Sequence, residues 1–113
     1  MDKKKQKVCE FIKKSCDDLQ KTSQTFQDIY NAIVNRNPSG KAYIYFDESD
    51  KQISSTYENF KDATFKTASK ISRLINTAPG SVVGIKLKNS PRWPTIFWAL
   101  LMAGHIPLLI DAR

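Results

Sequence analysis

The first third of the chain carries hydrophobic residues at helical spacing. Over residues 3–19 the apolar stripe is thin and consists of Val8, Ile12 and Leu19, with Ser15 between them. A fuller stripe at i, i+3, i+4, i+7 and i+8 follows, made of Phe26, Ile29, Tyr30, Ile33 and Val34. Two helices are therefore predicted. The second is expected to be capped by Thr22 or Ser23 and to end at the turn residues of 35–40.

The middle of the chain alternates between apolar and polar residues and then returns to helical spacing. Residues 41–47 read as a strand, residues 47–51 as a polar turn and residues 52–55 as a short return strand, which together predict a β-hairpin. Thr56 is the expected N-cap of a long helix that ends near Asn76. The predicted buried stripe of this helix consists of Tyr57, Phe60, Thr64, Thr67, Ala68, Ile71, Leu74 and Ile75.

The last third of the chain has the order strand, helix, strand. An apolar run over 82–87 is followed by Ser90 as a helix cap and Pro91 at the first helical position, where its missing N–H costs nothing. The helix that follows ends at Gly104, which suits a left-handed C-terminal cap, and a second apolar run covers 106–110. Its apolar stripe is Trp93, Ile96, Phe97, Leu100 and Leu101. This order predicts a βαβ unit with parallel strands.

These elements predict the α/β fold class: N-terminal helices, a β-hairpin, and then a βαβ unit with a partly parallel sheet. We expect residues 1–36 to form an N-terminal helical segment and residues 41–113 to begin an α/β domain. Parallel strands need cover on both faces, and the predicted helices cover only part of the apolar stretch 82–110. The chain by itself is therefore expected to expose an apolar patch and to dimerise or aggregate.

Three short segments carry a family resemblance. They read LMAGHIPLLID over 101–111, NSPRWP over 89–94 and STYENF over 55–60. The first resembles the second core motif of adenylate-forming (AMP-binding) enzymes, the second is similar to a helix start of that superfamily, and the third resembles its first core motif. The superfamily includes acyl-CoA synthetases, adenylation domains of peptide synthetases and luciferases. The chain departs from its pattern at Ser81, where Asp is usual, and at Leu109, where a second Pro is usual.

The resemblance implies an incomplete N-terminal subdomain of an adenylate-forming enzyme, truncated before the phosphate loop. Such enzymes activate a carboxylate with ATP and then pass the acyl group of the adenylate to a thiol. For the full-length protein the resemblance implies ATP and Mg²⁺ as cofactors. The implied partners are the remainder of its own polypeptide, a carboxylic acid, and CoA or a carrier-protein thiol. The implied parent is an AMP-forming acid–thiol ligase, closest to an acyl-CoA synthetase, and this chain alone is expected to be inactive and to hold no cofactor.

The residues that usually carry chemistry are sparse in this chain. The positions of its four glycines match no glycine-rich phosphate-binding motif. His105, the single histidine, follows the helix-ending glycine and has no partner in the sequence to orient it, so a structural role is expected. Asp111 lies at the end of a predicted parallel strand, where α/β folds place ligands, although the resembling family uses this position mostly for structure. We assign no catalytic, cofactor-binding or metal-binding residue.

A net charge of +7 leaves a second interpretation open. A free-standing, small, basic α/β module could bind nucleic acid or another protein through its lysine-rich helices. Outside the cluster Lys3, Lys4, Lys5 and Lys7, however, the basic residues are scattered among acids, a pattern that does not favour a nucleic-acid footprint. A basic amphipathic helix over 3–19 could also lie on a membrane. Its narrow apolar stripe favours packing against the rest of the protein instead.

The cysteines and the hydropathy pattern bear on the compartment. Cys9 and Cys16 would lie roughly 10 Å apart on one helix, too far for a disulfide, and a reduced environment fits them. Residues 8–13 are interrupted by charge and cannot form the apolar region of a signal peptide. No apolar run reaches the roughly 18 residues that span a membrane. The expected location is therefore the cytoplasm, without a transmembrane segment.

Overall fold

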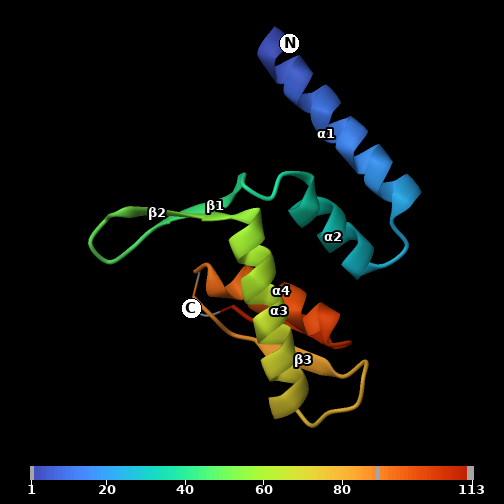
Figure 1. Cartoon of the computed structure of the whole chain (residues 1–113), viewed down its shortest axis with the longest axis vertical. Coiled ribbons are helices and arrows are strands. Elements are labelled where there is room, and N and C mark those ends of the chain that lie inside the picture. Colours follow the sequence, from blue (N-terminus) through green and yellow to red (C-terminus); the bar gives the residue numbers. More distant parts are fainter. Residues whose placement is uncertain (1, 89, 112–113) are drawn as a thin grey trace.

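The computed structural model describes residues 2–88 and 90–111 (Figure 1). Asn89, which belongs to the NSPRWP segment, and residues 112–113 lie outside this part. The elements are α1 (Lys3–Thr22), α2 (Phe26–Arg36), β1 (Lys41–Phe46), β2 (Gln52–Thr56), α3 (Tyr57–Leu74), β3 (Val82–Ile85), α4 (Arg92–Met102) and β4 (Ile106–Leu109). This order confirms the predicted α/β class, with N-terminal helices, a β-hairpin and a βαβ unit.

The core lies where α2, α3 and α4 pack together. Tyr30 and Val34 of α2 are each 1% exposed, and Phe60 of α3 completes the buried cluster. The Tyr30 ring lies 5.7 Å from the Phe60 ring and 5.2 Å from the Trp98 ring of α4, measured between ring centroids, in the tilted geometry that aromatic pairs prefer. Helix α4 is thereby fixed between α2 and α3 on one side and its own two strands on the other.

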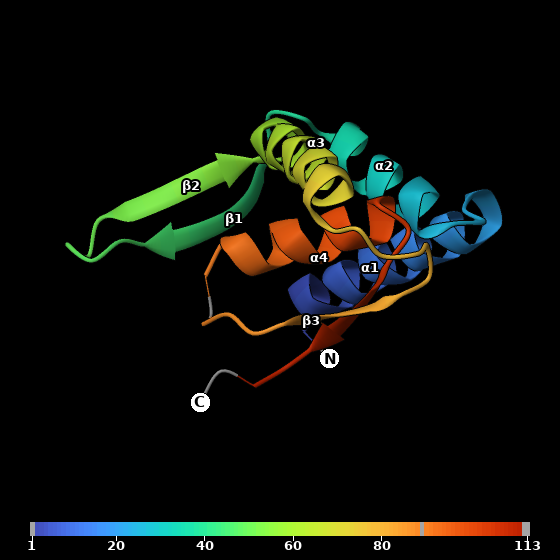
Figure 2. The same cartoon turned by 90° about the horizontal axis from the view of Figure 1, so that it is seen from below.

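The strands form two separate two-stranded sheets. Strands β1 and β2 pair antiparallel as the predicted hairpin, while β3 and β4 pair parallel, with Val82 opposite Ile106 and Ile85 opposite Leu109. The parallel pair lies on the opposite side of α4 from α3 (Figure 2). Three layers result: α2 and α3, then α4, then the β3–β4 sheet. The predicted order of strand, helix and parallel strand is confirmed.

The hairpin turns its tyrosine face toward the helices. Tyr43 meets Phe60 edge to face at 5.9 Å between ring centroids, and Tyr45 is half-buried beside it. The alternate residues Ile44 and Phe46 are exposed. The predicted alternation is therefore present, and Tyr43 packs against the core of this chain.

The predicted helix ends agree with the structure at two places and differ from it at two others. The Thr56 hydroxyl accepts a hydrogen bond from the Asn59 N–H at 3.1 Å, which confirms Thr56 as the cap of α3. Gly104 has φ +85°, which confirms the left-handed end of α4. The cap predicted for α2 is wrong: α1 continues through Thr22, and Thr25 caps α2 instead. Helix α4 begins at Arg92, one residue later than predicted.

In the predicted stripes of α2 and α3, one residue of each helix is exposed. Leu74, in the predicted stripe of α3, is 81% exposed, and Phe26, in the stripe of α2, is also exposed. Each occupies the terminal turn of its helix and extends past the helices that cover the rest of the stripe. Both residues lie on the predicted face of their helix, but the neighbouring helices do not reach far enough to cover them.

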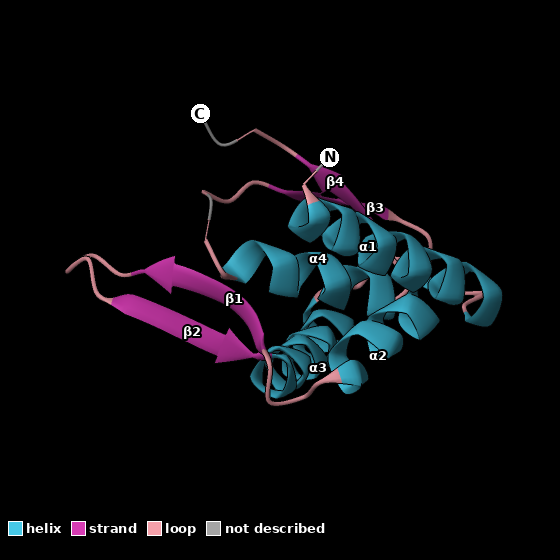
Figure 3. Ribbon diagram, turned by 90° about the horizontal axis from the view of Figure 1, so that it is seen from above, coloured by secondary structure: helices cyan, strands magenta, loops and turns pink. Residues whose placement is uncertain are grey.

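Helix α1 extends away from the three-layer body in Figure 1, and the β1–β2 hairpin extends away from it in Figures 1 and 3. The Cα radius of gyration is 16.2 Å, compared with about 13 Å for a compact domain of this length. No residue of α1 is buried. The chain thus has a small core and a large exposed surface relative to its size.

Candidate functional site

The carboxyl ends of β3 and β4 meet at one edge of the parallel sheet. Because the two strands run in the same direction, Ile85 and Leu109 both end there, and the Ile110 N–H donates to the Ile85 carbonyl at 2.9 Å. Helix α4 begins beyond the same edge, after the segment that follows β3. In open α/β sheets, ligands bind beyond the carboxyl ends of the strands. This edge is therefore the first place to look for a site.

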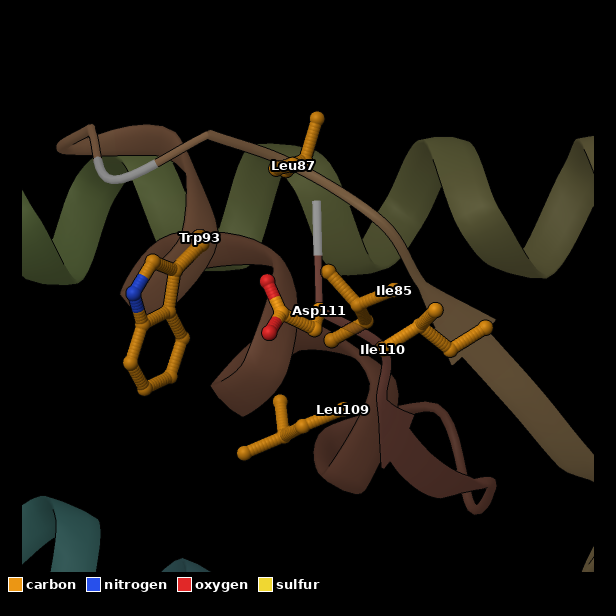
Figure 4. A pocket seen from close by; sticks show the side chains of 6 residues that line it. All are labelled: Ile85, Leu87, Trp93, Leu109, Ile110 and Asp111. Atoms are coloured by element: carbon orange, nitrogen blue, oxygen red, sulfur yellow. The ribbon is translucent and has the colours of Figure 1, made fainter. Parts of the chain in front are cut away.

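A shallow pocket of about 230 Å³ lies at this edge (Figure 4). Its lining comes from β3 and the residues after it, from the first turn of α4, and from β4 and the residues after it: Ile85, Leu87, Trp93, Leu109, Ile110 and Asp111. Figure 4 shows the carboxylate of Asp111 on the side of the pocket that faces the Trp93 ring. The structure therefore places Asp111 at a pocket beyond the carboxyl end of a parallel strand, where its position in the sequence led us to look.

The chemistry of this pocket is limited. Its lining offers one carboxylate, one indole and four aliphatic side chains. An active site normally combines several titratable groups in mutual geometry, and Asp111 is the single titratable side chain in this lining. Lys86 and Lys88, which follow β3, and Arg92, the first residue of α4, are exposed, but none of them lines the pocket. By itself the pocket can hold an apolar group beside a hydrogen-bond acceptor.

His105 lies at the opposite end of the sheet from this pocket. It precedes β4, whereas Asp111 follows β4, so about 20 Å of extended chain separates the two residues. Its imidazole is buried, and its backbone N–H donates to the Leu100 carbonyl at the end of α4. Within residues 2–88 and 90–111, its Nδ1 finds no hydrogen-bond partner. The structure does not bring the histidine and the aspartate together.

The described residues contain no group of three or more His, Cys, Asp or Glu side chains able to hold a metal ion. Cys9 and Cys16 are both exposed and unbridged on α1. In the same part of the chain, no helix is long and apolar enough to cross a membrane. The pocket at the sheet edge is thus the strongest candidate site, and it lacks the groups for chemistry of its own.

The face of the β3–β4 sheet away from α4 is open and apolar. In the described structure, α4 is the helix that contacts these strands. Side chains alternate along each strand, so Val83 and Ile85 turn toward α4 and the neighbouring positions turn away. The exposed large apolar residues of the open face are Val82, Ile106, Leu108 and Ile110. Both outer strand edges also lack a pairing strand in this structure. The predicted apolar patch is confirmed, and it lies beside the pocket.

Comparison with known proteins assigns the fold. The sequence model of the AMP-binding enzyme family matches residues 31–113. The N-terminal subdomain of Klebsiella oxytoca NpsA has a similar structure, with a TM-score of 0.71 and 22% identity over 80% of this chain. A fatty acyl-adenylate ligase from L. pneumophila, solved with acyl adenylate and pyrophosphate, gives a TM-score of 0.68 and 19% identity over 79% of this chain. The chain covers 22% and 15% of these two proteins. Curated protein sequences give no significant match.

Proposed function

The chain belongs to the AMP-binding enzyme family, and from this premise we propose that it forms part of the N-terminal subdomain of an ATP-dependent, carboxylate-activating enzyme. The observation that carries the proposal is the family match across residues 31–113, which includes both strands of the open sheet. The similarity to an N-terminal subdomain supports the placement within a larger enzyme.

The proposed reaction has two steps. In the first, a carboxylate oxygen attacks the α-phosphorus of ATP, which forms the acyl-adenylate and releases pyrophosphate. In the second, a thiolate attacks the acyl carbon, the bond from that carbon to the AMP oxygen breaks, and a thioester and AMP leave. CoA or a carrier-protein thiol is the proposed acceptor, with an acyl-CoA synthetase-like ligase as the preferred form.

The residues that line the pocket at the sheet edge do not fit a bound nucleotide. The pocket lining has one carboxylate and no cation to hold a triphosphate, and the described residues hold no cluster suited to Mg²⁺. We therefore place the ATP and Mg²⁺ sites on other parts of the polypeptide. Trp93 and Asp111 lie at the edge of the sheet that those parts would meet, which suits a supporting wall rather than the reacting centre.

The role proposed for this chain is to provide part of the sheet that supports the acid and ATP sites. The open face carries Val82, Ile106 and Leu108, and both outer strand edges present unpaired backbone groups in the described structure. A parallel sheet is normally covered on both faces. The remainder of the same polypeptide is the partner proposed to cover this one.

The test is ATP–pyrophosphate exchange, measured on the whole polypeptide and on this chain separately. The expected result is exchange that depends on an added carboxylic acid for the whole polypeptide, and background for this chain alone. Acid-dependent exchange by this chain would contradict the division of roles. Absence of exchange by the folded whole polypeptide across fatty, aryl and amino acids would contradict carboxylate activation.

A further inference from the structure

Helix α1 is nearly twice as long as the helix that supports it. At 1.5 Å per residue, its 20 residues extend about 30 Å, whereas the 11 residues of α2 extend about 16 Å. The two helices meet near the C-terminal end of α1. There Leu19 and Ser15 are half-buried, and the Arg36 guanidinium donates to the Ser15 hydroxyl at 3.0 Å and lies 4.7 Å from the centre of the Phe11 ring. The N-terminal half of α1 extends beyond this support (Figure 1).

The apolar stripe of α1 continues onto the unsupported half. Val8, Ile12, Ser15 and Leu19 follow i, i+4, i+7 and i+11 spacing, so they share one face of the helix. The two members near α2 are half-buried, but Ile12 is 54% exposed and Val8 is similarly exposed. The predicted packing of this stripe against the rest of the protein is thus present in the C-terminal half of α1 and missing in its N-terminal half.

The unsupported half is also the most basic part of the chain. Residues 3–14 contain six lysines and one glutamate, a net charge of +5 out of +7 for the whole chain. By the 100° step of an α-helix, Lys4 and Lys5 lie about 40–60° to either side of the Val8–Ile12 stripe. From these positions their stems can run along an apolar surface while their ammonium groups reach toward anions.

We propose that the N-terminal half of α1 docks the protein on an anionic membrane surface, with Val8 and Ile12 inserted at the level of the lipid headgroups. An interfacial helix of this kind needs an apolar stripe together with flanking lysines, and residues 3–14 present both on exposed positions. Phosphate contacts on a nucleic acid would use the lysines but leave the apolar stripe in water. Helix α1 also lies outside residues 31–113, the part of the chain that matches the family model.

The experiment is co-sedimentation of the chain with lipid vesicles. One set contains phosphatidylcholine alone, and the other contains phosphatidylcholine with phosphatidylserine at a ratio of 7:3. The proposal expects binding to the anionic vesicles that weakens at high salt, and little binding to the neutral ones. Ile12→Glu is expected to weaken binding at least tenfold, because it puts a charge on the stripe and adds repulsion. Leu74→Glu, at an exposed apolar residue on α3, is the matched control and should change binding less than twofold.

Charge is tested with a second matched pair. Lys4→Gln with Lys5→Gln should weaken binding several-fold, while Lys66→Gln with Lys70→Gln, which removes the same charge from the exposed face of α3, should change it less than twofold. An environment-sensitive dye on Cys9, with Cys16→Ser, should shift its emission to the blue on anionic vesicles. Circular dichroism verifies that each variant keeps its helix content.

Three results would overturn the proposal. The first is the absence of binding to anionic vesicles. The second is binding that Ile12→Glu leaves unchanged while Leu108→Glu removes it, which would assign binding to the open sheet. The third is salt-dependent binding to a generic polynucleotide that the α1 lysine variants weaken and Ile12→Glu does not, together with a dye on Cys9 that does not respond to vesicles.

Discussion

A Cβ atom added to Gly84 would lie 2.8 Å from Cδ1 of Ile110, so the residue after β4 folds across the glycine of β3. The same isoleucine bonds through its backbone to the Ile85 carbonyl, which holds it in place. Its side chain therefore covers part of the open sheet face at a point where the sheet has no side chain of its own. Gly84 admits a close contact here, whereas Gly104 serves a different purpose through its φ of +85°.

Gly84→Ala is expected to change the free energy of unfolding by less than about 1 kcal/mol. The new methyl group meets only the flexible end of Ile110, which can rotate toward solvent, and alanine restricts the unfolded chain. Gly104→Ala should destabilise by about 1–2 kcal/mol, since alanine disfavours the left-handed region. Urea unfolding of both variants measures the contrast. Equal losses for the two would show that the Ile110 contact is rigid.

Tyr30 is expected to contribute more to stability than any surface residue. Because its ring is 1% exposed and contacts Phe60 and Trp98, Tyr30→Ala should cost about 3–5 kcal/mol. Tyr30→Phe keeps the ring and removes a hydroxyl that lies 3.4 Å from the Phe60 carbonyl, so its cost should be about 1 kcal/mol or less. Denaturant midpoints measure both. A larger loss for Tyr30→Phe than for Tyr30→Ala would contradict this core.

The Tyr30 hydroxyl also predicts a response to alkaline pH. Burial raises the pKa of Tyr30 above its ordinary value of 10.0; the Thr64 hydroxyl opposes this shift and the Asp62 carboxylate adds to it. The folded state thus favours the neutral phenol, so this contribution is complete below pH 10 and declines as the pH rises through the folded pKa. Tyr30→Phe should flatten the loss of stability above pH 10. An alkaline profile that Tyr30→Phe leaves unaltered would argue against this cause.

The cap of α2 gives a third contrast. The Thr25 hydroxyl accepts from the Asp28 N–H at 3.1 Å, and the Asp28 carboxylate accepts from the N–H groups of Gln24 and Thr25. Thr25→Ala should therefore cost about 1 kcal/mol, whereas Thr22→Ala, at the residue that caps nothing, should cost less. Thermal unfolding compares them. Equal losses for the two variants would show that the Thr25 hydroxyl does not stabilise the start of α2.

Acid should weaken the same cap. The N–H groups of Gln24 and Thr25 lower the pKa of Asp28 below its ordinary value of 3.8, against a smaller opposing effect of burial. Because the folded pKa is depressed, this stabilisation is present above the ordinary pKa and is lost as the pH falls through the folded pKa. Asp28→Asn should remove that part of the acid response. An unaltered acid profile in Asp28→Asn would show that the carboxylate has no role in capping.

The open sheet face should make the isolated chain self-associate. Val82, Ile106 and Leu108 expose apolar surface together, so hydrophobic-dye binding and concentration-dependent light scattering are expected. Leu108→Glu should reduce both, while Leu74→Glu, at a more exposed but isolated leucine, should not. A sharp monomer peak at high concentration without dye binding would contradict an exposed patch.

Local sequence patterns were sufficient to predict those elements for which the pattern allowed a single interpretation. The hairpin, the βαβ order and the caps at Thr56 and Gly104 follow from short-range alternation and turn chemistry. The cap of α2 was misplaced because several hydroxyl residues precede that helix. Only Thr25 has an acidic residue three positions later to complete a capping box.

The other wrong predictions concern burial, which depends on how far the neighbouring helices extend along each apolar stripe. Leu74 and Val8 both lie on apolar stripes, yet they are exposed because the neighbouring elements end before them. Hydrophobic periodicity identifies the apolar face of a helix but does not give the length of the element that packs against it. Likewise, the sequence pointed to Asp111 by its place after a strand, but the approach of Trp93 and Leu87 depends on how α4 crosses the sheet.

The central claim is that this chain is one part of a larger adenylate-forming enzyme. The most direct measurement is the mass of the native polypeptide, detected with an antibody raised against this chain. The matched structures are several times longer than the segment they share with it, so we predict a species several times heavier than 12.9 kDa. A native species of 12.9 kDa alone would contradict the claim.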